Sequence, residues 1–461
     1  MQNKARICYQ IVIEGTLQLD SPLLIGSGQN MQSPESDIQV LKNEYDQPFI
    51  PGTSITGVLR HMIDGEDELA GRILFGHIED KDTQDSLQSA IMISDVLLSN
   101  TTIIVRDGVC INPYTRVAQK GQKYNYEAIE RSTEHDKVEG HLKIVVTLRE
   151  YHVINFPDWK LWIQSIVNQL AYGIRIGALT SKGFGRVSVP DIKAYLYDLS
   201  DFADVKNWLL QKPSAHRYEG KKKDTQPIGT FTISGDFSLK TSLLVRSYEL
   251  SQKEKENNIH AVPVLSDGDY LIPGTSVKGV LRHHAAQILL AIGKEAMLDS
   301  DFNDLMGFAD QKNSQKSRFF TDEVYISAKA VTAKKQTRNA IDRFTCSTMD
   351  SRLFAEKPLW QKDKTIPSVT IRYTITDSKK WERGLALFLL KDLWTGRIAL
   401  GGDQAVGRGY LQGIRATIRY FQSPNTVRQW IIEDNGHVIE GDTEELESFA
   451  RALLQTERKE N

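Results

Sequence analysis

The alternation of apolar and polar residues along the chain predicts strands at corresponding places in its two halves. Four segments alternate with a period of two, which is typical of strands with one buried face: residues 9–19, 141–151, 229–239 and 368–376. Apolar residues recur at helical spacing in residues 159–174 and 380–396. Strands and helices therefore interleave within each half. This order predicts an α+β fold with helices on one face of a sheet.

One motif occurs twice in the chain. The segment IPGTSITGVLR begins at Ile50, and IPGTSVKGVLR begins at Ile272, 222 residues later. Four further pairs of similar segments follow the same order, with offsets between 220 and 227 residues. Matches that keep their order over the length of each half indicate a tandem duplication.

The duplication sets the expected domain boundaries. We expect a first domain at residues 1–210 and a second at residues 228–419, joined by a linker at residues 211–227. The segment QKPSAHRYEGKKKDTQP in this linker is polar, rich in lysine and bounded by proline. Residues 420–461 form a C-terminal extension whose apolar spacing predicts an amphipathic helix.

Composition narrows the class of protein. The chain has 461 residues, of which 40% are hydrophobic, and no apolar run approaches the length of about 18 residues that spans a bilayer. The cysteines Cys8, Cys110 and Cys346 form no metal-binding or CxxC pattern. We therefore expect a cytoplasmic protein with no membrane partner. The net charge of −2 indicates no polyanion partner by itself.

The repeated PGTS motif predicts a turn followed by a helix. Thr53 or Ser54 would cap the first helix, and free amides beside a nearby arginine would suit a phosphate. An alternative is that the turn and the cap only organise the fold. The candidate contacts in this motif are Thr53, Ser54, Arg60, Thr275, Ser276, Lys278 and Arg282.

Two further groups of residues are candidates for RNA contacts. The glycine-rich turns SKGFGRV and VGRGYL each carry an arginine, Arg186 or Arg408. Two basic segments, TRVAQKGQKYNY at residues 115–126 and KKQTRNAIDRF at residues 334–344, also contain the aromatic residues Tyr124, Tyr126 and Phe344. Single-stranded RNA binders combine cations and aromatic rings in this way. Their candidate contacts are Arg116, Lys120, Lys123, Arg338 and Arg343. A solvated basic loop is the alternative for either segment taken alone.

The segments GFGRV, IPGTSxxGVLR and TRNAIDRFT together resemble the RAMP superfamily, specifically the backbone subunits of type III CRISPR effectors. The resemblance covers nearly all of both copies. The chain is most similar to type III-D-like systems, in which two backbone subunits are fused in one chain. It implies an RRM or ferredoxin-like fold in each copy and a thumb hairpin that interrupts the guide–target duplex. The implied partners are a CRISPR guide RNA, a complementary target RNA and other effector subunits.

The resemblance also implies a catalytic aspartate shortly before the PGTS motif, and in the first copy this position is Asp37. A carboxylate there would be a ligand for Mg²⁺ or another divalent cation. Aligning residues 40–41 with residues 264–265 puts Ala261 at the equivalent position of the second copy. We therefore expect an endoribonuclease that cuts target RNA at one site, in the first domain. Apart from the resemblance, Asp37 is an ordinary loop aspartate.

Two other functions are open. The chain could be an RNA-binding scaffold whose partner subunits cut the RNA. A nuclease that processes guide precursors would more often use a histidine, and His61, His283 and His284 follow the repeated helix. Because the helix itself recurs, these histidines are better interpreted as helix-face or packed residues.

Overall fold

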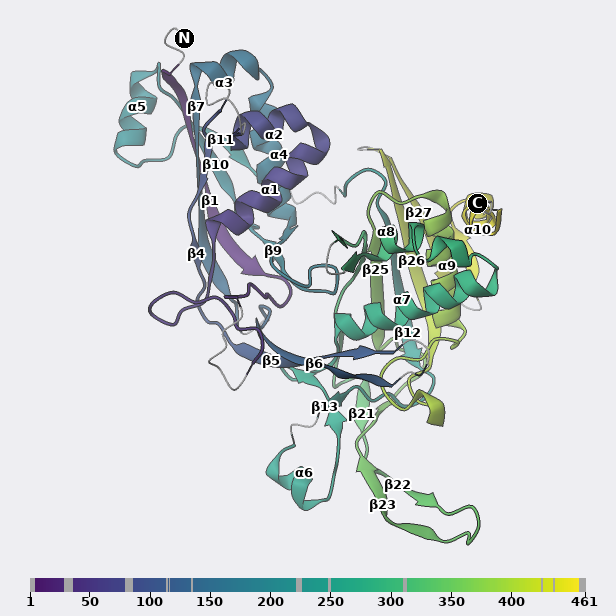
Figure 1. The fold of residues 1–461 in the computed structure, drawn as a ribbon. Helices are drawn as coiled ribbons and strands as arrows, with labels where there is room; N and C mark the ends of the chain where they lie inside the picture. The colour runs from purple at the N-terminus through teal and green to yellow at the C-terminus, as the bar shows by residue number, and fades with distance from the viewer. Residues whose placement is uncertain are drawn as a thin grey trace. The chain divides into compact units, whose positions relative to one another are not determined.

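The computed structural model describes residues 5–28, 36–78, 86–112, 115, 117–133, 136–220, 226–247, 250–309, 313–423, 426–433 and 436–455. The chain forms two compact units (Figure 1). The first unit comprises Met1–Thr180 and Phe184–Thr225, and the second comprises Ser181–Gly183 and Gln226–Asn461. No helix among the described residues is long and apolar enough to cross a membrane.

The first unit is built on an antiparallel sheet with the strand order β11-β10-β1-β7-β3, to which β9 and β8 are added beside β1. Its strands are β1 (Ile7–Leu19), β3 (Ile91–Ile93), β7 (Glu139–Arg149), β8 (Ile174–Arg175), β9 (Arg186–Ser188), β10 (Lys193–Asp198) and β11 (His216–Glu219). Along the chain, the four strands of the path β10-β1-β7-β3 follow the ferredoxin-like βαββαβ order.

Helices of the first unit bury one face of this sheet. They are α1 (Gly52–Glu66), α2 (Glu68–Phe75), α3 (Glu150–Asn155) and α4 (Trp159–Tyr172). Leu59 of α1 and Val167 of α4 belong to one buried cluster with Ile13 of β1 and Ile144 of β7. Helix α5 (Phe202–Leu209) packs beside β10 and contributes no side chain to this buried cluster. Alternating strand positions and every third or fourth helix position thus supply one core, as the hydrophobic pattern predicted.

A long hairpin is inserted between β3 and β7. It consists of β5 (Ile103–Ile111) and β6 (Ala118–Ile129), which pair antiparallel outside the main sheet (Figure 1). The short strands β2 (Phe49–Ile50) and β4 (Val96–Leu97) pair just before helix α1 and just before the hairpin. This insertion is the predicted thumb of the first copy.

The second unit repeats this topology. Its main sheet has the order β19-β25-β12-β26-β27-β28. The strands are β12 (Phe231–Leu239), β19 (Phe319–Thr321), β25 (Val369–Ile375), β26 (Leu411–Ser423), β27 (Thr426–Glu433) and β28 (His437–Glu440). The path β26-β12-β25-β19 corresponds to β10-β1-β7-β3, so both units have the same ferredoxin-like arrangement.

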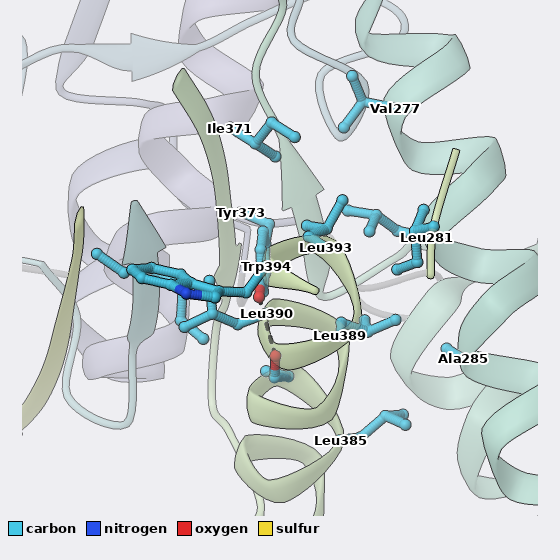
Figure 2. Packing of buried hydrophobic residues seen from close by; sticks show 14 of the residues in the cluster. Val277, Leu281, Ala285, Ile371, Tyr373, Leu385, Leu389, Leu390, Leu393 and Trp394 are labelled. Carbon is cyan, nitrogen blue, oxygen red and sulfur yellow. Dashed lines mark hydrogen bonds between the residues drawn. The ribbon is translucent and has the colours of Figure 1, made fainter. Parts of the chain in front are cut away.

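Two long helices cover this second sheet, α7 (Gly274–Ala291) and α9 (Lys380–Trp394). Figure 2 shows Leu281 of α7 and Leu389 of α9 packed together beside strand β25. The hydroxyl of the buried Tyr373 on β25 donates to the Ala386 carbonyl of α9 at 2.9 Å. The core therefore holds α9 against the sheet by both apolar contact and one satisfied polar group.

Shorter elements complete the second unit. Its second thumb consists of β22 (Gln336–Ile341) and β23 (Thr348–Glu356), inserted between β19 and β25 and extended away from that unit's sheet (Figure 1). The other paired strands are β13 (Arg246–Ser247), β14 (Val262–Pro263), β15 (Leu265–Ser266), β16 (Asp269–Ile272), β17 (Phe308–Ala309), β18 (Ser314–Gln315), β20 (Val324–Ile326), β21 (Val331–Ala333) and β24 (Leu359–Gln361). The short helices are α6 (Gln252–Glu256), α8 (Asp301–Met306), η2 (Glu295–Met297) and η3 (Gln404–Val406).

Both predicted connecting segments belong in part to the folded units. Strand β11 lies within the expected linker, 211–227, and pairs with β10. The expected extension, 420–461, supplies the end of β26, the strands β27 and β28, and the helix α10 (Thr443–Gln455). Phe449 of α10 packs edge-on against Phe231 of the central strand, with ring centroids 6.0 Å apart. The C-terminal residues are therefore part of the second core, which the sequence did not reveal.

Candidate nucleic-acid interface

The two PGTS motifs begin helices α1 and α7, but their hydroxyls do not cap them. Each helix starts at the glycine, with the preceding proline in the N-cap position and no side-chain cap hydrogen bond. Thr53 and Ser54 therefore lie in the first turn of α1, and Thr275 and Ser276 lie in the first turn of α7. The predicted capping role is wrong, because proline already fixes the backbone that enters the helix. The structure leaves their RNA contacts as predictions.

The arginines of the two helices have different surroundings. Arg60 of α1 is half exposed, and its Nε lies 3.4 Å from Asp64 Oδ2 one turn along the helix. Arg282 of α7 instead donates to the carbonyl oxygens of Met306 and Gly307, at 3.1 and 2.6 Å. Burial lowers the pKa of Arg282. No carboxylate of the described residues forms an ion pair with this guanidinium.

Lys278 of α7 is a second cation without a carboxylate partner among the described residues. Its Nζ donates to the hydroxyls of Ser317 and of Ser181, which belongs to the second unit, each at 2.8 Å. Burial, followed by the nearby positive charges of Lys182 and Arg282, lowers the pKa of Lys278 to about 7. Lys182, Lys278 and Arg282 thus form a cluster of buried and half-buried cations, which an anion would stabilise.

The glycine-rich turns of the two units can be superposed through one glycine in each. The Gly185 N–H donates to the Pro22 carbonyl and the Gly409 N–H to the Ser242 carbonyl, at 2.7 and 2.8 Å. Both glycines have positive φ and lie where a Cβ would meet a backbone oxygen, at 1.9 and 2.0 Å. Gly185 and Gly409 are therefore equivalent. The counterpart of Arg408 is consequently the preceding residue, Phe184.

The two units fill this equivalent position with different chemistry. In the first unit Phe184 packs against Tyr126 of the thumb base, with ring centroids 6.0 Å apart. In the second unit Arg408 Nη1 lies 2.7 Å from Glu356 Oε2, again at the thumb base. An aromatic pair in one unit is thus replaced by an ion pair in the other. Tyr126 is 1% exposed, so the structure does not favour the predicted base stacking for this ring.

Arg408 belongs to a network of three arginines and two carboxylates. Arg246, Arg338 and Arg408 all contact both Glu356 and Asp403, with nitrogen–oxygen distances between 2.7 and 2.9 Å. Burial would raise the pKa of Glu356, but hydrogen bonds from Arg408, Arg246 and Arg338 outweigh it and lower that pKa. No local pattern in the sequence indicates this network, because its members come from four separate segments: Arg246, Arg338, Glu356, and the turn that holds both Asp403 and Arg408.

This network changes the interpretation of two predicted RNA contacts. Arg408 is 3% exposed, and its second nitrogen, Nη2, also donates to Gln336 at 2.8 Å. The structure therefore favours a structural role for Arg408 over a phosphate contact. Arg338 is half exposed and ties strand β22 to the same carboxylates, so a phosphate would have to share it with Glu356 and Asp403.

The remaining predicted contacts lie mostly on exposed surface. Lys120 and Lys123 are exposed on β6, and Lys123 Nζ lies 3.2 Å from Asp107 Oδ2 across the hairpin. Arg343 is exposed in the turn of the second thumb, next to Phe344, which is 97% exposed. Arg186 lies 3.7 Å from Asp20 and over the ring of Tyr172. Arg116 lies outside the described residues.

Asp37 lies at the base of the first thumb. Its carboxylate oxygen Oδ2 accepts a hydrogen bond from the Asn125 N–H at 2.8 Å, and its own N–H donates to the Asn125 carbonyl at 3.1 Å. The residue is exposed, and its other oxygen, Oδ1, has no hydrogen-bond partner among the described residues. The loop is therefore held to β6 while one carboxylate oxygen is free for another ligand.

The comparisons with known proteins concern this same architecture. The model of the RAMP superfamily matches the chain twice, at residues 16–188 and at residues 236–412. The chain belongs to the RAMP superfamily. Apart from Ser181–Gly183 in the first match, each match falls within one ferredoxin-like unit, so the predicted tandem RAMP fold is confirmed.

Other comparisons add little to this assignment. No curated protein matches the chain. One solved structure that matches is described as "Cryo-EM structure of the Type III-B Cmr-beta bound to cognate target RNA", with 14% identity and a TM-score of 0.30. That alignment covers 41% of this chain and 61% of the other.

A divalent cation could be held at Asp37 only if RNA supplies the rest of its coordination shell. No group of three or more His, Cys, Asp or Glu side chains in the described ranges could hold a metal ion. Mg²⁺ commonly keeps several waters and takes one or two carboxylates together with substrate phosphates. The single free oxygen of Asp37 is compatible with such a shared site, and the described residues form no complete protein cage.

The three helix histidines do not come together as a catalytic group. His284 Nε2 lies 2.7 Å from Asp392 Oδ2 of α9, whereas His283 Nε2 lies 3.1 Å from the amide nitrogen of Gln287, one turn along α7. His61 is exposed on α1, in the first RAMP unit. These positions fit the interpretation of packed or helix-face residues.

Proposed function

We propose that this tandem RAMP protein is a backbone subunit of a type III CRISPR ribonucleoprotein in the cytoplasm. It binds a guide RNA, assembles with other effector subunits, and cuts complementary target RNA once, through the first unit. The observation that carries the proposal is the position of Asp37, which is fastened to the thumb base of a RAMP unit with one carboxylate oxygen free.

Binding of RNA is supported by cations that lack carboxylate partners. Lys278 and Arg282 lie on α7 within the second unit, and no ion pair within the described residues neutralises either of them. Lys278 is 5% exposed, so a phosphate would contact the half-buried Arg282 and favour the protonated form of Lys278 through its negative charge. Exposed Lys120 and Arg343 on the two thumbs add sites for phosphates along a bound strand.

The chemistry asked of Asp37 is limited. RNA carries its own nucleophile, the 2′-hydroxyl, so a cut needs an in-line arrangement, loss of a proton and stabilisation of the developing charge. Asp37 would hold a divalent cation through Oδ1 while the Asn125 N–H keeps Oδ2 in place. The cation, when bound, offsets negative charge on the phosphate. A nearby thumb would hold the strand in the unstacked form that in-line attack requires.

The test compares binding and cleavage in the assembled complex. Asp37→Asn keeps an oxygen that can accept from the Asn125 N–H but removes the charge, whereas Asp37→Ala removes both. We expect each variant to bind target RNA within a few-fold of the unmodified complex and to lose one specific product in Mg²⁺. Glu44→Ala is the matched control, because Glu44 is an exposed carboxylate later in the same segment.

Three results would contradict this assignment. Normal cutting by Asp37→Asn would mean that the residue acts only through its hydrogen bond to the thumb. Parallel loss of binding and cutting would make Asp37 structural. Unchanged products from both variants would favour a scaffold whose partner subunits do the cutting.

A further inference from the structure

The loop that carries Asp37 pairs with the thumb strand in a defined register. In the first unit the Asp37 N–H donates to the Asn125 carbonyl at 3.1 Å, and the Glu127 N–H donates to the Ile38 carbonyl at 2.9 Å. These bonds place Ile38 opposite Tyr126 in a parallel bridge. The same hydrogen-bond register in the second unit therefore identifies the residue that is equivalent to Asp37.

The second unit repeats these bonds with different residues. The His260 N–H donates to the Ala355 carbonyl at 2.8 Å, and the Lys357 N–H donates to the Ala261 carbonyl at 3.1 Å. Ala261 forms the parallel bridge with Glu356. The counterpart of Asp37 is therefore His260. The alignment that paired Asp37 with Ala261 is wrong by one residue.

The side chains agree with this register. Asp37 Oδ2 accepts from the Asn125 N–H at 2.8 Å, and His260 Nδ1 lies 3.3 Å from the Ala355 nitrogen, its donor. Asp37 and His260 are both exposed, whereas Ala261 is 2% exposed. A side chain at position 261 is consequently directed into the unit and would not reach RNA on the surface.

The surroundings of the two equivalent residues differ in charge. Two residues beyond Asn125 the first thumb strand carries Glu127, and the matching position of the second unit is Lys357, whose Nζ lies 2.8 Å from Glu254. The first unit therefore presents Asp37 and Glu127 where the second presents His260 and Lys357. Glu127 Oε2 accepts from the Val40 N–H at 3.0 Å, and Lys357 is paired with Glu254, so the difference that RNA would meet lies mainly at the first position of each pair. The Asp37 carboxylate suits a hard cation, whereas the His260 imidazole suits a phosphate.

We propose that His260 contacts the RNA backbone in the second unit, at the position equivalent to that of Asp37, the proposed cutting residue of the first unit. The imidazole holds the strand without supporting magnesium-dependent cleavage, and a carboxylate at this one position converts the contact into a second cutting site. This inference rests on the proposed function of Asp37. It assigns the two units different tasks on one backbone scaffold, cutting in the first and holding in the second.

The reaction expected of the converted site is a transesterification within RNA. The 2′-oxygen of one nucleotide bonds to the adjacent phosphorus while the bond from phosphorus to the 5′-oxygen breaks. The 2′-hydroxyl proton passes to water, and the leaving 5′-oxygen takes a proton from water. The products are a 2′,3′-cyclic phosphate and a 5′-hydroxyl end, and no oxidant or reductant is needed.

The test uses the complete complex with its guide RNA and an end-labelled complementary target. His260→Asp should add one product of new length in Mg²⁺, and this product should persist in the double variant Asp37→Ala/His260→Asp. Asn257→Asp, which puts a new charge three residues earlier in the same segment, should add none. Absence of the new product from an assembled His260→Asp complex overturns the inference, as does its appearance with Asn257→Asp.

A second measurement separates holding from cutting. His260→Ala should weaken target binding several-fold without changing which products are made, because it removes a backbone contact and no metal ligand. Unchanged affinity would overturn the holding role, including in the case that His260→Asp does not assemble. If Asp37→Ala leaves all products intact, the proposed function fails first. If Asp37→Ala removes the first product but His260→Asp adds none, only the inference about the second unit fails.

Discussion

Replacement of Arg408 distinguishes a structural arginine from an RNA-binding one. Its guanidinium donates to Glu356, Asp403 and Gln336, and the residue is 3% exposed. In Arg408→Ala, both carboxylates remain but lose one of three arginines, and a cavity opens beneath the glycine-rich turn. We therefore expect a loss of folding stability that is confined to the second unit.

The magnitude follows from the geometry. Breaking a buried ion pair by removing one partner costs about 3–5 kcal/mol. Because Arg246 and Arg338 still face both carboxylates, we expect the lower end of this range, about 3 kcal/mol. For a unit of this size, 1 kcal/mol shifts the melting temperature by about 2–4 °C, so the shift should be roughly 6–12 °C.

Differential scanning calorimetry of the full chain measures this shift, and hydrogen–deuterium exchange assigns it to a unit. Exchange should rise in residues 336–356 and 399–411 of Arg408→Ala and stay unchanged in the first unit. Arg408→Lys should also lose stability, because lysine keeps the charge but cannot donate through a planar fork to three acceptors. A variant of either kind with normal stability and a reduced salt dependence of RNA binding would refute the structural role.

Three further expectations follow from the structure. RNA affinity should fall as the pH rises from 7 to 9, by up to about tenfold per pH unit. The reason is that a bound phosphate favours protonated Lys278, whose pKa of about 7 in the free protein reflects burial and then the nearby cations. In a pH series of filter-binding assays, Lys278→Met should abolish this pH dependence, and a fall in affinity that persists in the variant would contradict the role of Lys278. The folding stability of the protein without RNA should depend on pH in the opposite direction. Above pH 7 the unfolded chain binds more protons than the folded chain, so the contribution of Lys278 to stability rises as the pH approaches 10. Lys120→Ala and Arg343→Ala should each reduce the slope of log affinity against log salt by about 0.7 if each side chain contacts one phosphate of a single strand, and an unchanged slope in fluorescence anisotropy would exclude that contact. Phe449→Ala should destabilise the second unit by about 3–5 kcal/mol in calorimetry, because its ring is buried among Phe231, Tyr420 and Trp430; a near-neutral change would make the C-terminal helix an appendage.

Hydrophobic periodicity and the internal repeat were sufficient to predict the two-unit α+β architecture. Ile13 and Ile144 lie in one core because their strands alternate, and Leu59 joins them because helix α1 has a regular apolar face. The same reasoning predicted the amphipathic C-terminal helix but not the place where Phe449 packs. The apolar spacing of such a helix is the same whether the helix covers its own unit or another surface. Only tertiary packing decides which apolar face it meets.

The candidate site was less accessible to sequence reasoning. A shift of one residue in pairing Asp37 with the second copy hid His260, because only backbone hydrogen bonds to the thumb strand define the register. Arg408 was predicted as an RNA contact because it lies in a glycine-rich turn. Its partner Glu356 is 52 residues away in sequence, and no motif marks its other partner, Asp403, as an ion-pair residue. By contrast, the contacts predicted for Lys278 and Arg282 from the repeated helix stay predictions. Neither cation has a carboxylate partner in the described part of the chain, and Lys278 is 5% exposed.

The RNA that accompanies the protein tests the central proposal most directly. The measurement is sequencing of RNA extracted from the complex after the tagged full-length chain is purified with its partner subunits from cells that carry a CRISPR array. The proposed function predicts one dominant class of short RNAs that share a repeat-derived end and differ in spacer sequence. Recovery of no RNA, or of fragments that sample cellular transcripts at random, would contradict the assignment of this chain as a guide-binding backbone subunit.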